Sequence, residues 1–251
     1  MLWLNGGPGG STIASGLLFE NGPCRFSPES NTTVYNDFGW NEKVNIIYLE
    51  QPAGTGFSYG TGSSTTLSNL AEDVYAFLQL WMHRFPGYAR LPLHIAGESW
   101  GGHYVPNIGS YIDQQNERLV YAPRPGQLEL KLASLTLANG LTEPRSQLET
   151  VTEYLCGGAP YPPYRPDDRR CKAWRAATPA CLRMIDTCYR YRNNATCVAA
   201  TTYCWPVVFT HPLQGMWLDV VRSPFVTLGL YARPPSFRKE SIRPARGLPR
   251  Y

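Results

Sequence analysis

Apolar residues in the first 145 positions form short runs that alternate with longer amphipathic segments. The short runs have the length of β-strands and lie at 2–4, 44–49, 93–96 and 132–138. Apolar residues recur at helical spacing over about 69–85, and a second helix is expected over about 102–117. Strands that alternate with helices form parallel sheets covered on both faces, so residues 1–145 are predicted to be an α/β domain.

The first of these helices carries its own boundary signals. Asn69, with Glu72 three residues later, predicts a capping box at its start. Pro86 and Gly87 predict its end, because neither residue continues a helix well.

The second half of the chain differs in composition. Six of the seven cysteines in the chain fall within 49 residues of this half, amid Pro-rich and charged sequence: Cys156, Cys171, Cys181, Cys188, Cys197 and Cys204. Such a segment builds little hydrophobic core, so covalent cross-links stabilise it most. There is no C-x-x-C and only His211 lies nearby, which argues against zinc and for disulfides. We expect a Cys-rich insert at 146–221, and the 23 Gly and 22 Pro predict many turns or an irregular insert.

Charge is unevenly distributed. The chain has 23 basic and 19 acidic residues, a net charge of +4. Residues 222–251 hold seven basic residues and one acid, so this tail carries +6 and the rest of the chain −2. A mildly acidic body excludes a nucleic-acid interpretation based on overall charge. The tail has no hydrophobic period and is predicted to be disordered or wrongly translated.

Disulfides require an oxidising compartment, which favours the secretory pathway. Two glycosylation sequons agree with this, at Asn31 and at Asn194. No apolar run approaches the ~20 residues of a membrane span, so no membrane partner is expected. The first residues lack the features of a signal peptide, so the sequence is expected to begin inside a longer product.

The pentapeptide Gly97-Glu98-Ser99-Trp100-Gly101 follows a predicted strand and opens a predicted helix. This is the context of a G-x-S-x-G nucleophile elbow, in which flanking glycines relieve crowding around a strained serine. The helix N-terminus supplies free amides near developing negative charge. The alternative is an ordinary Gly-rich turn between a strand and a helix.

A second Gly-rich segment, Asn5-Gly6-Gly7-Pro8-Gly9-Gly10, follows the first predicted strand. Its unhindered amides are suited to an oxyanion hole. A flexible turn or a phosphate loop are the alternatives, but a phosphate loop requires a Gly-Lys-Ser/Thr sequence that is absent here.

Several motifs in register resemble the serine carboxypeptidase family. They are Trp3–Gly9, Glu20-Asn21-Gly22-Pro23, Glu50-Gln51-Pro52 with Gly54–Tyr59, Gly97–Gly101 with His103-Tyr104, and Asn139–Pro144. The blocks come in the family's order and cover residues 2–144. The resemblance implies an α/β-hydrolase fold with a disulfide-rich insert, and hydrolysis of C-terminal residues from peptides.

The resemblance also implies roles for individual residues. Ser99 would be the nucleophile, with the backbone amides of Gly7 and Trp100 as the oxyanion hole. The substrate's C-terminal carboxylate would be bound by Trp3, Asn5, Gly6, Glu20 and Glu98. Facing carboxyl groups must share protons, so an acidic working range is expected. Without the resemblance, both glutamates would be interpreted as solvated or helix-capping side chains.

For the insert, the resemblance implies the pairs Cys156–Cys171, Cys181–Cys204 and Cys188–Cys197, one of fifteen pairings for six cysteines. Cys24 is left over, either with a partner in a longer chain or as a buried thiol. No cofactor or metal is implied. The expected partners are peptides or proteins with a free C-terminus, in a vacuolar, lysosomal or extracellular compartment.

A hydrolase of this fold also needs an Asp and a His after the serine. None of the four histidines, His83, His94, His103 and His211, matches the family's catalytic block, nor do Asp113, Asp167, Asp168, Asp186 and Asp219. The chain is therefore expected to be a fragment that lacks the Asp and His blocks. Two other functions stay open: an acyltransferase on the same scaffold, and a secreted binding protein without catalysis.

Overall fold

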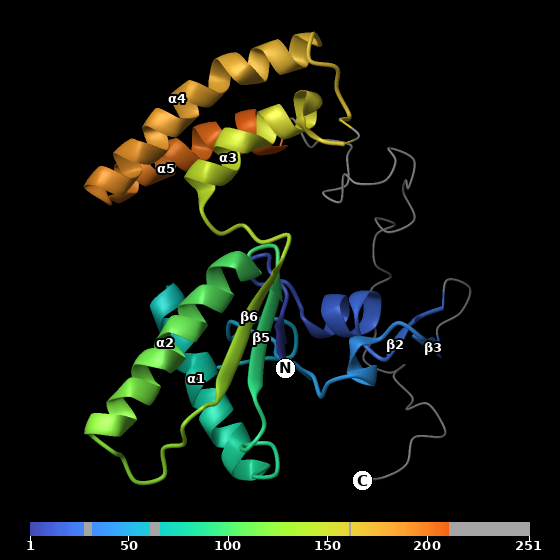
Figure 1. Cartoon of the computed structure of the whole chain (residues 1–251), viewed down its shortest axis with the longest axis vertical. Helices are drawn as coiled ribbons and strands as arrows, with labels where there is room; N and C mark the ends of the chain where they lie inside the picture. Colours follow the sequence, from blue (N-terminus) through green and yellow to red (C-terminus); the bar gives the residue numbers. More distant parts are fainter. Residues whose placement is uncertain (28–31, 61–65, 161, 211–251) are drawn as a thin grey trace. The chain divides into compact units, whose positions relative to one another are not determined.

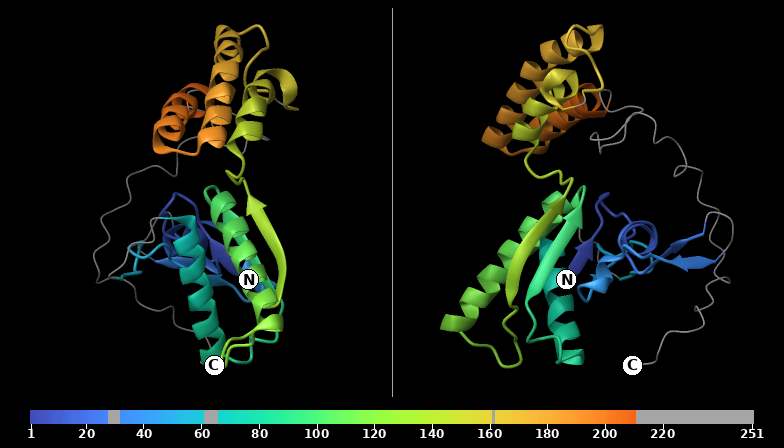
Figure 2. Two further views of the ribbon diagram at one scale, coloured as in Figure 1. Left: turned by 90° about the vertical axis from the view of Figure 1, so that its left-hand side faces the viewer. Right: turned by 45° about the vertical axis from the view of Figure 1, so that its right-hand side comes forward.

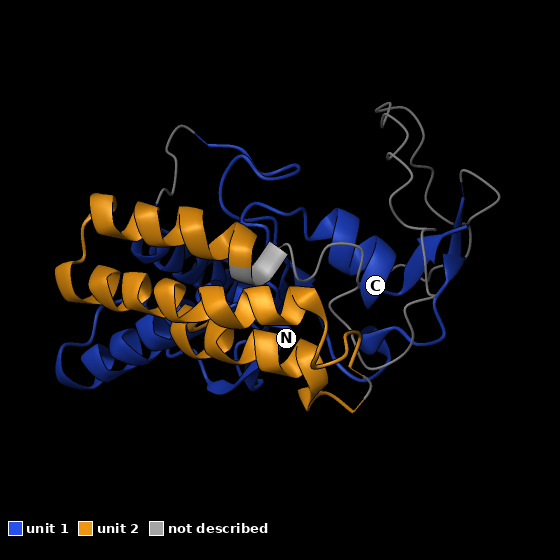
Figure 3. Ribbon diagram, turned by 90° about the horizontal axis from the view of Figure 1, so that it is seen from above, with its two compact units in different colours: residues 1–141, 238–251 blue, residues 142–237 orange. Residues whose placement is uncertain are grey.

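The computed structural model describes residues 1–27, 32–60, 66–160 and 162–210. The predicted basic tail, Asn31, His211 and Asp219 lie outside these residues. The chain divides into two compact units, with residues 1–141 in unit 1 and the described residues from 142 onward in unit 2 (Figure 3).

Unit 1 is built on a four-stranded sheet in the order β4-β1-β5-β6, and every pair in it is parallel. The strands are β1 (Leu2–Leu4), β4 (Ile47–Tyr48), β5 (Leu93–Glu98) and β6 (Leu132–Ala138). Leu2 is aligned with Ile47 on one side and with Ile95 on the other. The predicted parallel sheet is confirmed.

Two long helices, α1 (Leu67–Arg84) and α2 (Gly101–Tyr121), lie side by side on one face of this sheet (Figures 1 and 2). Their apolar stripes pack with the strands into the main core, whose fully buried members include Leu4, Leu78, Ile95 and Ile108. Both of these helices therefore cover the same face of the described sheet. Leu135 of β6 retains 44% of its surface, because β6 is the edge of the described sheet.

Three local predictions need correction. Thr66, rather than Asn69, is the N-cap of α1, and its Oγ1 accepts a hydrogen bond of 3.2 Å from the Asn69 amide. The expected buried strand at 44–49 shrinks to Ile47–Tyr48, because it pairs only with the three-residue β1. α2 extends four residues beyond the expected end, to Tyr121.

Short elements between β1 and β4 were not predicted. They are the π-helical turn η1 (Ile13–Glu20), the antiparallel pair β2 (Cys24–Phe26) and β3 (Thr33–Tyr35), and the 3₁₀ turn η2 (Trp40–Glu42). Cys24, in β2, is a half-buried free cysteine in the described chain.

Unit 2 is helical. It consists of α3 (Pro144–Glu153), η3 (Tyr154–Gly158), α4 (Arg169–Tyr191), α5 (Asn194–Cys204) and η4 (Trp205–Thr210). The expectation of an irregular insert is wrong, because α4 has a regular buried stripe: Cys171, Trp174, Thr178, Cys181 and Ile185. None of the helices described is long and apolar enough to cross a membrane.

Three disulfides cross-link unit 2, joining Cys156 to Cys171, Cys181 to Cys204, and Cys188 to Cys197. They are the pairs that the family resemblance implies. The second and third join α4 to α5 at separate points, so the two helices form a stapled hairpin.

The core of unit 1 gives a first prediction. Ile108→Ala removes a side chain with no exposed surface, so we expect the free energy of unfolding to fall by about 2–5 kcal/mol. Leu80→Ala is the matched control, because Leu80 is 71% exposed, and it should change stability by no more than about 0.5 kcal/mol. Urea-induced unfolding measures both, and equal losses would contradict the core assignment.

Candidate active site

Ser99 lies in the tight turn between β5 and α2, and its backbone has a positive φ of 58°. A residue with a Cβ rarely adopts this left-handed conformation, which costs about 1–3 kcal/mol and persists only where the surroundings hold it. Three hydrogen bonds do so here. The Ser99 amide donates to Ala138 O at 3.1 Å, and Ser99 O accepts from the amides of Gly102 and Leu141 at 3.0 and 2.8 Å. Ser99 is half-buried.

The flanking glycines let β5 and α2 approach each other. A Cβ on Gly97 would lie 2.8 Å from Val105 Cγ2 and 3.1 Å from Gly101 Cα, closer than such atoms pack. A Cβ on Gly101 would lie 3.3 Å from Leu4 O. Packing thus disfavours a side chain at Gly97 strongly and at Gly101 more weakly.

The Gly-rich turn at 5–10 lies directly against the elbow. A Cβ on Gly6 would overlap the Trp100 amide nitrogen and lie 2.9 Å from Ser99 Cβ. The Gly10 amide donates to Gly6 O at 2.9 Å, which closes the turn. The Gly9 amide donates to the buried Tyr104 hydroxyl of α2 at 3.3 Å. The turn that carries Gly7 and the elbow that carries Trp100 therefore meet at Ser99.

A group of polar side chains lies beside this point, and we call Asn5, Glu20 and Glu98 the carboxyl cluster. Asn5 Nδ2 donates to both carboxylate oxygens of Glu20 at 3.0 Å and, over a longer distance of 3.5 Å, to Glu98 Oε2. The amide oxygen of Asn5 accepts from Trp3 Nε1 and from the Gly16 amide, both at 3.0 Å. Asn5, only 3% exposed, is thus fixed with its NH₂ group towards the two glutamates.

The cluster disfavours negative charge. Burial of its carboxyl group raises the pKa of Glu20, and the hydrogen bond from Asn5 offsets part of this rise. Glu20 as a residue is exposed, so its carboxyl group is only partly withdrawn from water. Burial, and next the charge of Glu20, raises the pKa of the Tyr48 hydroxyl to about 12. Protons are therefore held more tightly here than on isolated side chains.

Glu50 is a functional candidate to which the sequence assigned no role. It is 6% exposed and accepts hydrogen bonds from Ser11 Oγ, from the Phe57 amide, and from the Ile13 amide at 3.3 Å. Its carboxylate occupies the space that a Cβ on Gly56 would take. Glu50 therefore ties the 54–58 loop to the segment that follows the Gly-rich turn. An acid directly after an apolar run was the signal available in the sequence.

The described histidines are engaged elsewhere. His83 Nε2 lies 2.5 Å from Gly126 O, and His94 Nδ1 lies 2.8 Å from Ser134 Oγ. The His103 ring stacks on Trp100 at 4.1 Å between centroids, and burial lowers its pKa while a hydrogen bond to the Leu141 backbone partly opposes this. Among the described residues of unit 1, none of these rings is hydrogen-bonded to Ser99.

The aspartates named from the sequence also have other contacts or lie at the surface. Asp168 caps α4 through the Arg170 amide, and Asp186 pairs with Arg145 Nε at 2.8 Å, both within unit 2. Asp167 pairs with Arg165, and Asp113 is exposed on α2.

Comparisons with known proteins agree with this geometry. The profile of the family described as serine carboxypeptidase matches residues 1–214. Carboxypeptidase Y homolog A of Ajellomyces dermatitidis is 39% identical over 204 residues, covering 81% of this chain and 35% of that protein. The homolog of Paracoccidioides lutzii is 37% identical over 225 residues, covering 90% and 38%.

One solved structure shows the same fold. It is the crystal structure of Kex1(delta)p, a prohormone-processing carboxypeptidase from Saccharomyces cerevisiae, with a TM-score of 0.65 and 22% identity over 82% of this chain and 44% of that one. A parallel sheet with a strained serine between strand and helix thus defines an α/β-hydrolase fold. The chain belongs to the serine carboxypeptidase family. It spans about 35% of the length of the first curated relatives it matches.

The contact between the Gly-rich turn and the elbow gives a second prediction. We expect Gly6→Ala to destabilise unit 1 strongly, by more than about 3 kcal/mol, because the new methyl group overlaps backbone atoms that cannot move aside. Gly87→Ala is the matched control, because nothing lies within 4 Å of its Cβ position. Thermal unfolding compares the two, and a tolerated Gly6→Ala would refute the close contact.

The raised pKa of Glu20 gives a third prediction. A carboxyl whose folded-state pKa lies above its unfolded value stabilises the fold below that unfolded value, and this contribution is lost as pH rises through the folded pKa. The free energy of unfolding should therefore depend less on pH between about 4 and 7 in Glu20→Gln than in the unaltered chain. Glu72→Gln, at an exposed site on α1, is the control. Urea unfolding at both pH values tests this, and an unchanged difference in Glu20→Gln would contradict it.

Proposed function

We propose that this chain supplies the nucleophile and substrate-binding part of a serine-type carboxypeptidase, which releases C-terminal residues from peptides through an acyl-enzyme at Ser99. The observation that carries the proposal is the junction of strained Ser99 with Asn5 and Glu98. Because Glu98 directly precedes Ser99, a carboxylate bound at the cluster places the last peptide bond of a substrate near the Ser99 hydroxyl.

The chemistry follows from these positions. Ser99 Oγ attacks the carbonyl carbon of the last peptide bond, and the amides of Gly7 and Trp100 stabilise the negative oxygen that forms. Collapse of this intermediate breaks the C–N bond, releases the C-terminal amino acid and leaves an ester on Ser99. Water then hydrolyses the ester. Both steps need a general base, and no described histidine of unit 1 is hydrogen-bonded to Ser99.

The carboxyl cluster explains how the terminal carboxylate is selected. Asn5 Nδ2 is a donor, and a protonated Glu20 or Glu98 adds an O–H donor, so a substrate carboxylate receives several hydrogen bonds. Once the glutamates ionise, they repel it. Because burial raises the pKa of Glu20, protonation persists to a higher pH than for an exposed glutamate, and binding weakens as pH rises through that pKa. Two neighbours outside the cluster complete the proposed carboxylate site: Trp3, which donates to Asn5 Oδ1, and Gly6, which follows Asn5 in the chain.

A second function, binding of C-terminal carboxylates without turnover, is supported by the separate engagement of His83, His94 and His103. We further propose passage through the secretory pathway to a vacuolar, lysosomal or extracellular location. The three disulfides support this, because such bonds persist in oxidising compartments.

Peptide binding gives a fourth prediction. At about pH 4.5, a peptide with a free C-terminus should bind the chain about tenfold more tightly than the same peptide with a C-terminal amide. The amide lacks the negative charge and so loses one charge-assisted hydrogen bond. Asn5→Ala should abolish this preference. Asn107→Ala, an asparagine on the exposed side of α2, should leave it intact. Equal affinity for the two peptides would overturn the proposed carboxylate site.

A fluorophosphonate probe separates the two functions. Labelling that disappears in Ser99→Ala supports an activated nucleophile and hence hydrolysis. Selective peptide binding without labelling supports the binding function for this chain.

A further inference from the structure

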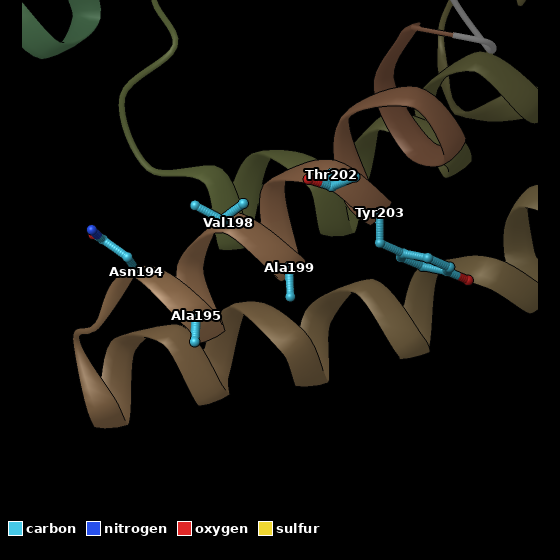
Figure 4. A pocket seen from close by; sticks show the side chains of 6 residues that line it. All are labelled: Asn194, Ala195, Val198, Ala199, Thr202 and Tyr203. Atoms are coloured by element: carbon cyan, nitrogen blue, oxygen red, sulfur yellow. The ribbon is translucent and has the colours of Figure 1, made fainter.

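The sequon at Asn194 opens helix α5 of unit 2, and its neighbour Asn193 is the N-cap. Asn193 Oδ1 accepts a hydrogen bond of 3.0 Å from the Thr196 amide, so the capping role of the first turn is already filled. The side chain of Asn194 is exposed and makes no hydrogen bond within the described chain. It extends away from the helix pair at the first turn of α5 (Figure 4).

The outer face of α5 forms a shallow, open depression of about 670 Å³, which we call the α5 groove. Its lining residues carry no charge and follow one side of the helix: Asn194, Ala195, Val198, Ala199, Thr202 and Tyr203 (Figure 4). Val198 keeps 61% of its surface exposed. The groove begins at Asn194 and ends at Tyr203, and nine residues of α-helix span about 14 Å.

Packing within unit 2 keeps this face outward. Ala200 and Cys204, on the opposite side of α5, are buried against Cys181 and Ile185 of α4. Disulfides at Cys197 and Cys204 prevent α5 from rotating to bury Val198 instead. The helix therefore presents a rigid, uncharged surface next to a free asparagine amide.

We propose that Asn194 carries an N-linked oligosaccharide and that its first sugars lie along the α5 groove, over Val198 towards Tyr203. One residue both lines the groove and bears the acceptor amide, so the attached sugar starts at the groove's end. The apolar faces of sugar rings pack well on an uncharged surface that includes an aromatic ring. A charged ligand would find no partner on such a surface. This site is independent of the catalytic proposal.

The modification is a glycosyl transfer. The Asn194 amide nitrogen forms a bond to the anomeric carbon of an oligosaccharide carried on a polyprenyl diphosphate, whose anomeric C–O bond breaks. The polyprenyl diphosphate leaves, and the amide loses one proton. Both the donor and the transferase belong to the secretory pathway, and the acceptor Asn-Ala-Thr triplet is intact in the chain.

Occupancy is tested on the full chain secreted from a eukaryotic host. Treatment with a peptide N-glycosidase in ¹⁸O-water should convert Asn194 to ¹⁸O-labelled aspartate, located by peptide mass spectrometry. Asn194→Gln and Thr196→Ala should each abolish the label, whereas Asn193→Ser, which keeps both the sequon and a capping residue, should retain it. An unmodified Asn194 in the secreted chain would overturn the proposal.

The position of the sugars is tested by native-state deglycosylation. Val198→Asp places a charge in the groove without changing a core residue. We expect the glycosidase to remove the glycan about fourfold faster from this variant, because the glycan loses a contact worth about one buried methylene group. Val120→Asp, at an exposed valine of α2, is the matched control and should not alter the rate. An unchanged rate in Val198→Asp, or a dimer of the chain that Val198→Asp dissociates, would refute packing of the glycan on α5.

Discussion

The site depends on the contact of two backbone turns that have no side chains between them. Gly6 lies against the Trp100 amide and Ser99 Cβ, and Gly97 lies against Gly101 and Val105. A Cβ on Gly6 would push the Gly-rich turn away from the elbow, and a Cβ on Gly97 would separate β5 from the start of α2. This contact keeps Ser99 at a positive φ, brings the Gly-rich turn to the serine, and sets Glu98 within reach of Asn5. The strain at Ser99 is tolerated because both sides of the contact belong to the same packed core.

Buried polar groups complete what the glycines begin. Asn5 uses its oxygen for Trp3 and Gly16 and its NH₂ group for the glutamates, so neither end of the amide is free to rotate. Glu50 accepts three donors from two loops and thereby holds the segment after the Gly-rich turn. In a poorly solvated site each such bond is costly to lose, since the remaining partner stays buried and unpaired. The same poor solvation raises the pKa of Glu20, so the structural restraint and the preference for a protonated cluster have one cause.

The elbow has a recognisable sequence pattern because backbone geometry restricts its positions to few residue types, whereas only the resemblance to serine carboxypeptidases singled out Glu20 and Glu98. Glycines that a Cβ would crowd, and a serine between strand and helix, leave a readable pattern. The spacing of apolar residues predicts where α1, α2 and β6 lie, but it does not predict at which residues they begin and end. The N-cap moved from Asn69 to Thr66, because either side chain can cap and only packing decides where the first turn begins. The role of Glu50 depends on loops that meet only in the folded chain.

The helices of unit 2 are hard to recognise in the sequence for a different reason. Its cysteines are cross-links, but Cys171, Cys181 and Cys188 also belong to the apolar stripe of α4, together with Trp174 and Ile185. A buried half-cystine contributes apolar surface and a covalent bond at one position, so few other apolar residues are needed to hold three helices together. Because disulfides hold α5 against α4, the outer face of α5 does not need to pack against another element. An uncharged outer face can persist there because the stapled hairpin, rather than burial of Val198, determines the orientation of the helix.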